Sequence, residues 1–285
     1  MPRLLALLLM LVALAGCGAE ERVGEIADEA EQELRDQGKR LRAEVRRLRD
    51  RIEELIGRLE QAVPRAQRTS PDVQVVGPDG RQSIDDFLTG VLANVDAYWT
   101  RTFAANDLPE PRVSYVWVPP GRVGLTGCGA PADDNAAFYC SADDTIYVAQ
   151  RFAAAVYEGA LRGLPGEASG GRAAGDFGVA YIVAHEYAHN LQHELGLFSL
   201  ARSNSSEPFE LQADCLAGAW GSSVFAAGKL TPEDIEEAVG TALAVGDFDV
   251  SSANHHGTPQ ERRSAWLTGF RSADPSTCRR YVPAT

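Results

Sequence analysis

The stretch "VAHEYAHNLQHELG", residues 183–196, is the most informative part of this sequence. It places His185, His189 and His193 four residues apart. Apolar residues at helical spacing accompany them and Gly196 closes the stretch, so we expect one helix to carry all three histidines. On a helix, His185 and His189 lie on one face about 6 Å apart along the axis, which lets both imidazoles reach one zinc ion. His193 lies about 12 Å along the axis from His185, too far to join the same tetrahedral ion.

A carboxylate that could complete such a site follows on the next expected helix. Glu210, in "ELQAD", comes 21 residues after His189. Three protein ligands and one open position are typical of a catalytic zinc site. Asp214 lies one turn further along the same face, where it could accept a hydrogen bond from a ligand histidine. Glu186 points about 100° away from His185 around the helix axis, so it could take a proton from water at the metal without being a ligand.

The same residues also have an ordinary explanation. Two histidines can simply form a solvated or hydrogen-bonded helix face, and a string of the form HExxH arises by chance in about one chain in a hundred or fewer of this length. That explanation does not account for the ExxxD pattern of Glu210 and Asp214 on a second helix. The combination therefore favours one catalytic Zn²⁺ bound by His185, His189 and Glu210.

The charge balance of the chain excludes some partners. The 285 residues carry a formal net charge of −13, and the pI is near 4.9. Such a chain repels nucleic acid and anionic lipid surfaces, so we expect no nucleic-acid partner. Hydrophobic residues make up 45% of the sequence, which is enough to form a sizeable core.

The N-terminus has the features of an export signal. Arg3 precedes an apolar run from Leu4 to Ala15 that is too short to span a bilayer. The following "LAGC" resembles the bacterial lipobox, in which the cysteine is acylated and becomes the first residue. We expect residues 1–16 to be a lipoprotein signal peptide. Lipidated Cys17 would then anchor the chain to the outer face of the bacterial cytoplasmic membrane, or make it a periplasmic-facing lipoprotein. The alternative is a plain secretory signal with Cys17 near the cleavage point by chance.

Export would place the other four cysteines in an oxidising compartment, where an even number favours disulfide bonds. Four cysteines permit three pairings. We expect Cys128–Cys140, which would close a short loop rich in glycine, proline and aspartate, and Cys215–Cys278, which would tie the end of the chain to an interior helix. Free thiols are the alternative.

The segment after the signal peptide is dense in charge. Within residues 17–62, apolar residues between positions 41 and 59 follow the alternating spacing of a coiled-coil seam. We expect a lipid-anchored helical stalk, which acts either as a solvated spacer or as a homo-oligomer interface through residues 41–59. Residues 63–72 contain two prolines and are expected to form a linker. Residues 73–285 would then be one domain.

That domain is expected to be mostly helical with a small sheet. Apolar spacing predicts a helix that Ser83 caps and that extends to Trp99. Runs of β-branched and aromatic residues predict strands at 112–118 and 145–149, and the glycine-rich segment 163–178 is expected to be a loop. Three later helices have start signals, the last one a capping box, at Ser206, Thr231 and Thr258.

At the level of motifs, the sequence is similar to a known family. "VAHEYAHNLQ", "ELQADCLAGAW" and "HHGTPQERRSAWLTGF" resemble the bacterial neutral zinc metallopeptidase family in the same order, as does "GCGAPADDNAAFYCSADDTIYV" ahead of them. The similarity covers roughly residues 87–278 and leaves the stalk unmatched. HExxH followed by ExxxD is also similar to the thermolysin-like zincins, whose site of two histidines and a glutamate is a known catalytic zinc arrangement.

The resemblance implies a zincin-like α+β fold that is mostly helical. It also implies zinc ligands and a catalytic carboxylate at positions already named, His185, His189, Glu210 and Glu186. Ala188 and Asn190 stand where the family often has glycine and histidine. Neither residue is needed to bind a metal, but the difference leaves the substrate preference open.

We therefore expect zinc-dependent hydrolysis of peptide bonds in a peptide or protein substrate, as an endopeptidase would perform it. Glu186 would pass a proton from water to the leaving amine, and a second donor should stabilise the negative charge that develops on the carbonyl oxygen. His256 is the candidate donor, with Tyr187 behind it, although His256 could instead cap or pack near Thr258. The intact Glu186 and the open coordination position favour an enzyme over the alternatives, which are a non-catalytic, zinc-stabilised binding or assembly lipoprotein that uses the stalk, and a stalk protein without metal.

Overall fold

The computed structural model describes residues 74–77, 80–200 and 205–281. The chain divides into two units, and the second unit, residues 65–285, contains every described residue. The signal peptide, the lipidation site Cys17, the stalk and the linker expected from the sequence lie outside the described residues. None of the helices in the described part is long and apolar enough to cross a membrane.

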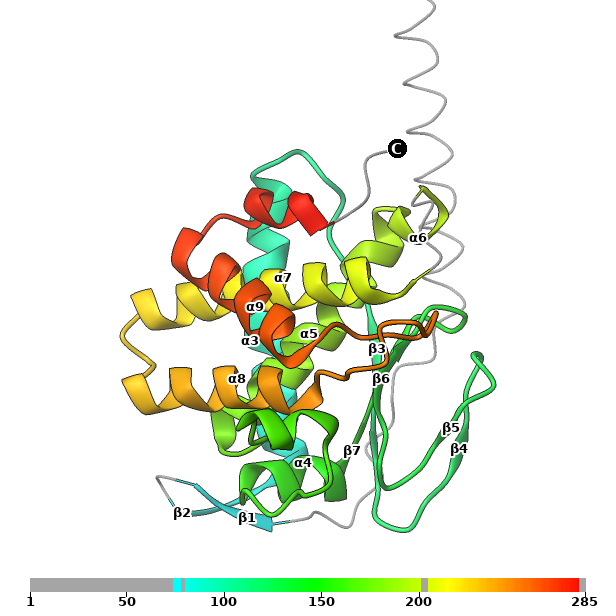
Figure 1. Cartoon of the computed structure of the whole chain (residues 1–285), viewed down its shortest axis with the longest axis vertical. Helices are drawn as coiled ribbons and strands as arrows, with labels where there is room; N and C mark the ends of the chain where they lie inside the picture. Colours follow the sequence, from blue (N-terminus) through cyan, green and yellow to red (C-terminus); the bar gives the residue numbers. More distant parts are fainter. Residues whose placement is uncertain (1–73, 78–79, 201–204, 282–285) are drawn as a thin grey trace, which may run out of the picture. The chain divides into compact units, whose positions relative to one another are not determined.

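Figure 1 shows the helices and strands along the chain. In chain order they are β1 (Gln74–Gly77), β2 (Gly80–Ser83), α3 (Ile84–Ala104), β3 (Ser114–Val118), β4 (Gly124–Leu125), β5 (Pro131–Ala132), β6 (Ala137–Cys140), β7 (Thr145–Ala149), α4 (Gln150–Tyr157), α5 (Asp176–Glu194), α6 (Leu197–Leu200), α7 (Glu207–Ala226), α8 (Pro232–Val245) and α9 (Pro259–Ser272), with short 3₁₀ helices at Pro165–Ser169 and Pro275–Tyr281. The prediction of a mostly helical α+β domain with a small sheet is confirmed.

Helix α3 begins where the sequence predicts. The Ser83 hydroxyl oxygen accepts a hydrogen bond from Asp86 N at 3.5 Å, which satisfies one of the free N–H groups of the first turn. Apolar residues three and four positions apart face the core, namely Ile84, Leu88, Leu92, Val95, Trp99 and Phe103. Because this stripe continues to Phe103, the helix extends beyond the predicted end at Trp99.

A three-stranded sheet has the order β3-β7-β6. Strand β3 pairs parallel to β7, with Ser114 opposite Thr145, and β6 pairs antiparallel to the other side of β7. All five residues of β7 are buried, as expected for a strand with both faces covered. Because β6 is the last strand in the order β3-β7-β6, it is an edge strand, and it packs beside α5.

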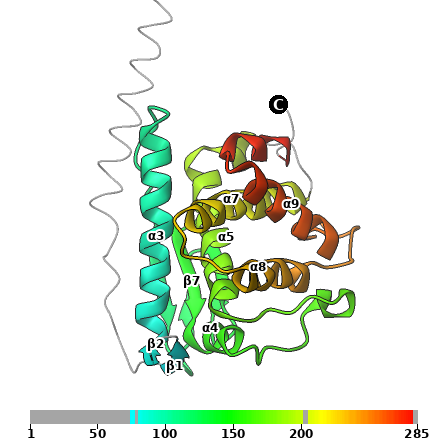
Figure 2. The same cartoon turned by 90° about the vertical axis from the view of Figure 1, so that its left-hand side faces the viewer.

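Helix α5 runs through the middle of this unit. It packs against α3, α4, α7 and α8 and against strands β6 and β7, so 15 of its 19 residues are buried. Figure 2 shows α5 between α3 on one side and α8 on the other. The predicted loop over residues 163–178 is wrong at its end, because α5 already begins at Asp176. Gly175 ends the loop with a φ of 82°, a conformation that favours glycine, and a side chain at that position would overlap Glu237.

Helices α7 and α9 approach each other closely because two glycines lie at their contact. A Cβ atom at Gly218 would overlap the carbonyl oxygen of Trp266, and one at Gly269 would overlap the carbonyl oxygen of Cys215. The two backbones therefore touch without intervening side chains. Figure 1 shows the two helices side by side.

The structure contains both favoured disulfides. Cys128–Cys140 joins the loop around β4 to the end of β6, and Cys215–Cys278 joins α7 to the C-terminal 3₁₀ helix. The second bridge holds the end of the chain against the helix that carries Glu210.

Two of the three predicted helix starts have the expected cap. Thr231 and Thr258 both form capping boxes, in which the threonine and the third helical residue exchange hydrogen bonds. Helix α7 also starts directly after Ser206, but Ser206 forms no side-chain cap. Its hydroxyl donates instead to the carbonyl oxygen of His255 at 2.7 Å.

Candidate metal centre

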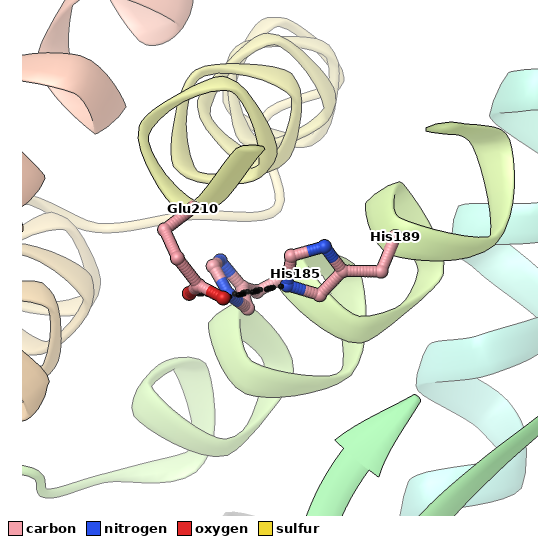
Figure 3. Close-up of side chains that lie close together, drawn as sticks. All are labelled: His185, His189 and Glu210. Atoms are coloured by element: carbon pink, nitrogen blue, oxygen red, sulfur yellow. Dashed lines mark hydrogen bonds and ion pairs between the residues drawn. The ribbon is translucent and has the colours of Figure 1, made fainter. Parts of the chain in front are cut away.

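Helices α5 and α7 bring three potential metal ligands together (Figure 3). His185 and His189 project from one face of α5, and Glu210 projects toward them from the first turn of α7. The Nε2 atoms of the two histidines are 3.2 Å apart. The Glu210 oxygens lie 3.1 Å from His185 Nε2 and 3.4 Å from His189 Nε2.

These separations fit a zinc ion. Zinc bonds to histidine nitrogen and carboxylate oxygen are about 2.0–2.2 Å long, so two ligands of one tetrahedral ion lie roughly 3.3–3.5 Å apart. The three ligand atoms of His185, His189 and Glu210 are all within 4.8 Å of one another. Two imidazoles and one carboxylate also form the donor set of several catalytic zinc sites. The residues present therefore fit zinc and leave one coordination position to water or substrate.

Asp214 lies where the sequence predicts a partner for a ligand histidine. Its Oδ1 is 2.9 Å from His185 Nδ1 and also accepts a hydrogen bond from the Tyr181 hydroxyl at 2.6 Å. Arg262 from α9 donates to both Asp214 oxygens, from Nε at 2.8 Å and from a terminal nitrogen at 2.9 Å. With its Nδ1–H directed at Asp214, His185 presents the lone pair of Nε2 to the metal position.

A glutamine performs the corresponding task for His189. Gln192 Oε1 lies 2.9 Å from His189 Nδ1, while its amide nitrogen donates to the Phe209 carbonyl oxygen at 2.8 Å and to Gln212 Oε1 at 3.1 Å. Because the amide nitrogen is occupied in this way, the oxygen of Gln192 must face the ring. His189 then carries its proton on Nδ1 and its lone pair on Nε2.

The ionised forms of the buried carboxylates and histidines in this centre stabilise one another. Burial opposes ionisation of Glu210 and Asp214, but His189 and His185 hold the pKa of Glu210 well below its usual range, and Arg262 lowers the pKa of Asp214. In turn, Asp214 and Glu210 raise the pKa of His185 to about 9, against burial and the nearby Arg262. The raised pKa of His185 favours a proton on its ring, and a metal ion would take the place of that proton. Metal binding should therefore release protons.

Glu186 lies beside this centre without belonging to the ligand set. Its side chain is 8% exposed, and its Oε2 accepts a hydrogen bond from the Tyr139 backbone nitrogen of β6 at 2.8 Å. Burial raises the pKa of Glu186 above its usual range, although His185 and His189 oppose the increase. Glu186 and the ligands line the same cavity, so its carboxylate can reach what binds there.

Two cavities meet at the metal centre. One of about 380 Å³ is lined by Glu186, His185, His256 and Arg262 among others, and one of about 480 Å³ extends past the first turn of α7 and Phe198. Both are lined by His189, Glu210 and Tyr139. The space therefore continues on both sides of the ligands, as a chain that passes through the site would require.

Of the other residues considered from the sequence, His256 lies at the cavity, whereas Tyr187 and His193 do not lie where a catalytic or ligand role would require. His256 lines the same cavity as Glu186, and its Nδ1 lies 3.1 Å from Asp247 Oδ2. The prediction of Tyr187 as a reserve donor is wrong, because Tyr187 is fully buried and its hydroxyl donates to Asp96 on α3 at 2.7 Å. His193 lies outside the ligand group, and its Nδ1 is 2.6 Å from the Tyr139 hydroxyl.

Three residues of this centre were not predicted from the sequence, namely Arg262, Gln192 and Tyr181. Tyr181 lies four residues before His185, so helical spacing alone could have placed it on the ligand face. Gln192 lies three residues after His189, so helical spacing could also have placed it on the ligand face. Arg262 reaches the site from α9, and only its place in the capped "TPQERR" segment pointed to it.

The profile of the family described as "Putative neutral zinc metallopeptidase" matches residues 50–281, so the chain belongs to that family and the resemblance seen in its motifs is confirmed. The match begins before residue 87, so the expectation that the whole stalk is unmatched is wrong for residues 50–62. Membership supports a zinc-dependent hydrolase that acts on peptides. No solved structure matches the chain.

The curated relatives carry no assigned activity in their names. The Escherichia coli (strain K12) protein named "Uncharacterized protein YpfJ" is 35% identical over 176 residues, which are 55% of this chain and 58% of that protein. The Mycobacterium tuberculosis (strain H37Rv) protein named "Uncharacterized protein Rv2575" is 29% identical over 216 residues, 67% of this chain and 68% of that protein. The chain thus spans less than two thirds of the length of the Escherichia coli relative.

Proposed function

We propose that this protein is a zinc-dependent endopeptidase whose ion is held by His185, His189 and Glu210. The observation that carries the proposal is the convergence of these three side chains beside Glu186 in one cavity. When bound, a zinc ion would act as a Lewis acid that lowers the pKa of water and polarises a carbonyl group. The remaining chemistry would fall to the side chains around it.

Glu186 would move the proton. The backbone hydrogen bond from Tyr139 fixes one of its oxygens, and the carboxylate borders the cavity that a substrate would enter. From there Glu186 would accept a proton from the attacking water and hand it to the nitrogen of the leaving amine. Its raised pKa brings its basicity closer to neutral pH, which favours transfer in both directions.

His256 would stabilise the negative charge that develops on the carbonyl oxygen. Asp247 holds Nδ1 and the backbone nitrogen of His256, which positions the ring at the cavity. In its charged form the ring donates from both nitrogens, with Nδ1 directed at Asp247 and Nε2 available for the substrate oxygen.

The substrate would be an extended polypeptide segment. Cavity space on both sides of the metal centre suits a chain that continues in both directions, rather than only a chain end. Strand β6 forms the edge of the sheet beside the same cavity, and edge strands can pair with extended peptides through backbone hydrogen bonds. These features together favour internal cleavage.

The proposed location is the outer face of a bacterial membrane, with Cys17 lipidated and residues 17–62 acting as a stalk. The lipobox-like segment motivates this proposal, and two disulfides support it because such bonds persist in oxidising compartments. Mass spectrometry of the mature protein tests it. An acylated N-terminal Cys17 is expected, and an unmodified N-terminus elsewhere would contradict the anchor.

The central experiment is the substitution Glu186→Gln. Loss of the base should lower peptide hydrolysis by roughly 10²–10⁴-fold, while zinc content measured by elemental analysis stays at the wild-type level. Glu194→Gln is the matched control, because Glu194 lies on the same helix but lines neither cavity. Its activity should stay near wild type.

Three outcomes would count against the proposal. Full activity of Glu186→Gln would reject Glu186 as the base, and wild-type protein without bound zinc would reject the metal centre. Zinc-loaded wild type that cleaves no member of a diverse peptide library would favour the non-catalytic binding or assembly lipoprotein.

A further inference from the structure

A second group of potential metal ligands lies apart from the three described above. Glu207 begins α7, Glu261 lies in the first turn of α9, and His255 belongs to the segment that precedes α9. Their ring nitrogen and carboxylate oxygens all lie within 4.8 Å of one another. We propose that Glu207, His255 and Glu261 bind a second divalent metal ion of the zinc class. This inference does not depend on peptidase activity.

The strongest observation is the state of His255. Its side chain is 1% exposed, and its Nδ1 is hydrogen-bonded to Asp247 Oδ1. The other ring nitrogen, Nε2, is buried and forms no hydrogen bond with any group in the described part of the chain. An unpaired buried nitrogen costs free energy. Since Nδ1 is occupied by Asp247, Nε2 is the nitrogen left to serve a metal shared with the two glutamates.

The surroundings of His255 repeat those of His185. In both cases an aspartate holds Nδ1, Asp247 for His255 and Asp214 for His185. A carboxylate on Nδ1 keeps the proton there and leaves the lone pair of Nε2 for a metal. This arrangement recurs behind histidines that bind metals.

The two glutamates supply negative charge that no lysine or arginine in the described part of the chain offsets. Among the described residues, neither Glu207 nor Glu261 forms an ion pair with a lysine or an arginine. The capping box uses just one oxygen of Glu261, Oε2, which accepts from Thr258. The other oxygen stays available, so two carboxylates and one imidazole can meet at one cation. That donor set suits zinc or a similar transition metal better than calcium, which prefers oxygen ligands alone.

A metal here would tie together the parts that surround the cavity. It would join the first turns of α7 and α9 to the segment that Ser206 already holds, through bonds to Ala253 O and His255 O. Asp247 contacts both His255 and His256. The second ion would therefore steady the loop that presents His256 to the cavity, and its role would be structural.

Metal stoichiometry tests the proposal on the full chain. Metal-free protein is incubated with excess zinc chloride, desalted, and analysed for zinc per chain. Glu207→Gln and Glu261→Gln should each bind one equivalent less than wild type. Glutamine still completes a capping box, so Glu261→Gln should keep α9 intact, and circular dichroism checks the fold of both variants. Glu233→Gln, a first-turn glutamate of α8 outside these ligand groups, is the control and should match wild type.

The test also separates the two metal sites. A double variant His185→Ala and His189→Ala should lose one equivalent and keep the other, whether or not the protein is a peptidase. If either folded variant, Glu207→Gln or Glu261→Gln, binds as much zinc as wild type, the second site does not exist as proposed. Loss of one equivalent in both, with Glu233→Gln unchanged, supports it.

Discussion

Arg262 is the buried cation of the candidate metal centre. It is 4% exposed, and its guanidinium faces both oxygens of Asp214, which is fully buried. Taking two such charges out of water is costly, and the pair is tolerated because each group meets the other through two charge-assisted hydrogen bonds. Arg262 thereby fixes the carboxylate that orients His185.

Removal of this cation should be strongly destabilising. Arg262→Ala leaves Asp214 as a buried charge without its partner, and we expect the free energy of unfolding to fall by about 3–5 kcal/mol. Urea denaturation of the metal-free proteins measures the difference. Arg271→Ala, at the exposed end of the same helix, should change it by less than about 1 kcal/mol. Equal losses in both variants would mean that the buried pair has no special role.

At the residue scale, the sequence was informative about local spacing and weak about distant partners. His185, His189 and Glu186 follow from positions on one helix, and Glu210 with Asp214 follow from one turn of a second. Arg262 comes from a third helix whose direction no local pattern specifies. The prediction of Tyr187 as a reserve donor was wrong because the helix turns its ring toward Asp96 on α3.

At the scale of elements, the close contact of α7 and α9 is the feature most sensitive to sequence. Gly218 and Gly269 let each backbone touch the carbonyl oxygen of the other helix. The Glu210 and Asp214 side chains leave α7 on the N-terminal side of this contact, and Arg262 leaves α9. The spacing of the two helices therefore sets the distance over which Arg262 and Asp214 meet.

A methyl group at this contact should push the helices apart. Gly218→Ala is expected to lower the free energy of unfolding by about 1–3 kcal/mol, as overpacking does elsewhere, because backbone atoms must move to admit the Cβ. Gly90→Ala is the matched control on α3, where nothing lies within 4 Å of the added atom. That change should instead stabilise by about 0.5–1 kcal/mol. Thermal unfolding distinguishes the two, and a stabilised Gly218→Ala variant would contradict the described packing.

The elements that the sequence revealed are those with a strong local pattern. The strand at 145–149 matches β7, and the capped helices start at the predicted threonines. Strands β4, β5 and β6 have two to four residues, too short for alternation to show. Strand β6 matters most among them, because it carries the backbone nitrogen that binds Glu186.

At the scale of the whole domain, two disulfides reinforce a core that helices already form. In the chain-entropy account, the stabilisation grows with the loop that a bridge closes. Cys215–Cys278 spans 63 residues and Cys128–Cys140 spans 12. The longer bridge also holds the last described segment, which otherwise touches the domain mainly through α7 and α9.

The two bridges should therefore differ in effect. Replacing Cys215 and Cys278 by alanine should lower the free energy of unfolding by about 4 kcal/mol, and replacing Cys128 and Cys140 by about 3 kcal/mol. Urea denaturation of the two double variants, in the same metal-free state, gives both values. A smaller loss for the longer loop would show that native contacts, rather than chain entropy, dominate.

The near-complete burial of α5 has a consequence for how the protein matures. The two candidate ligand histidines stand on a helix with 15 of its 19 residues buried, and Glu210 stands on a helix tied by a covalent bridge. The proposed coordination geometry would thus be preorganised by the polypeptide, unlike that of small zinc fingers, which fold only around their ion. A chain built in this way would complete its folding and the oxidation of its cysteines first, and would bind the proposed ion afterwards.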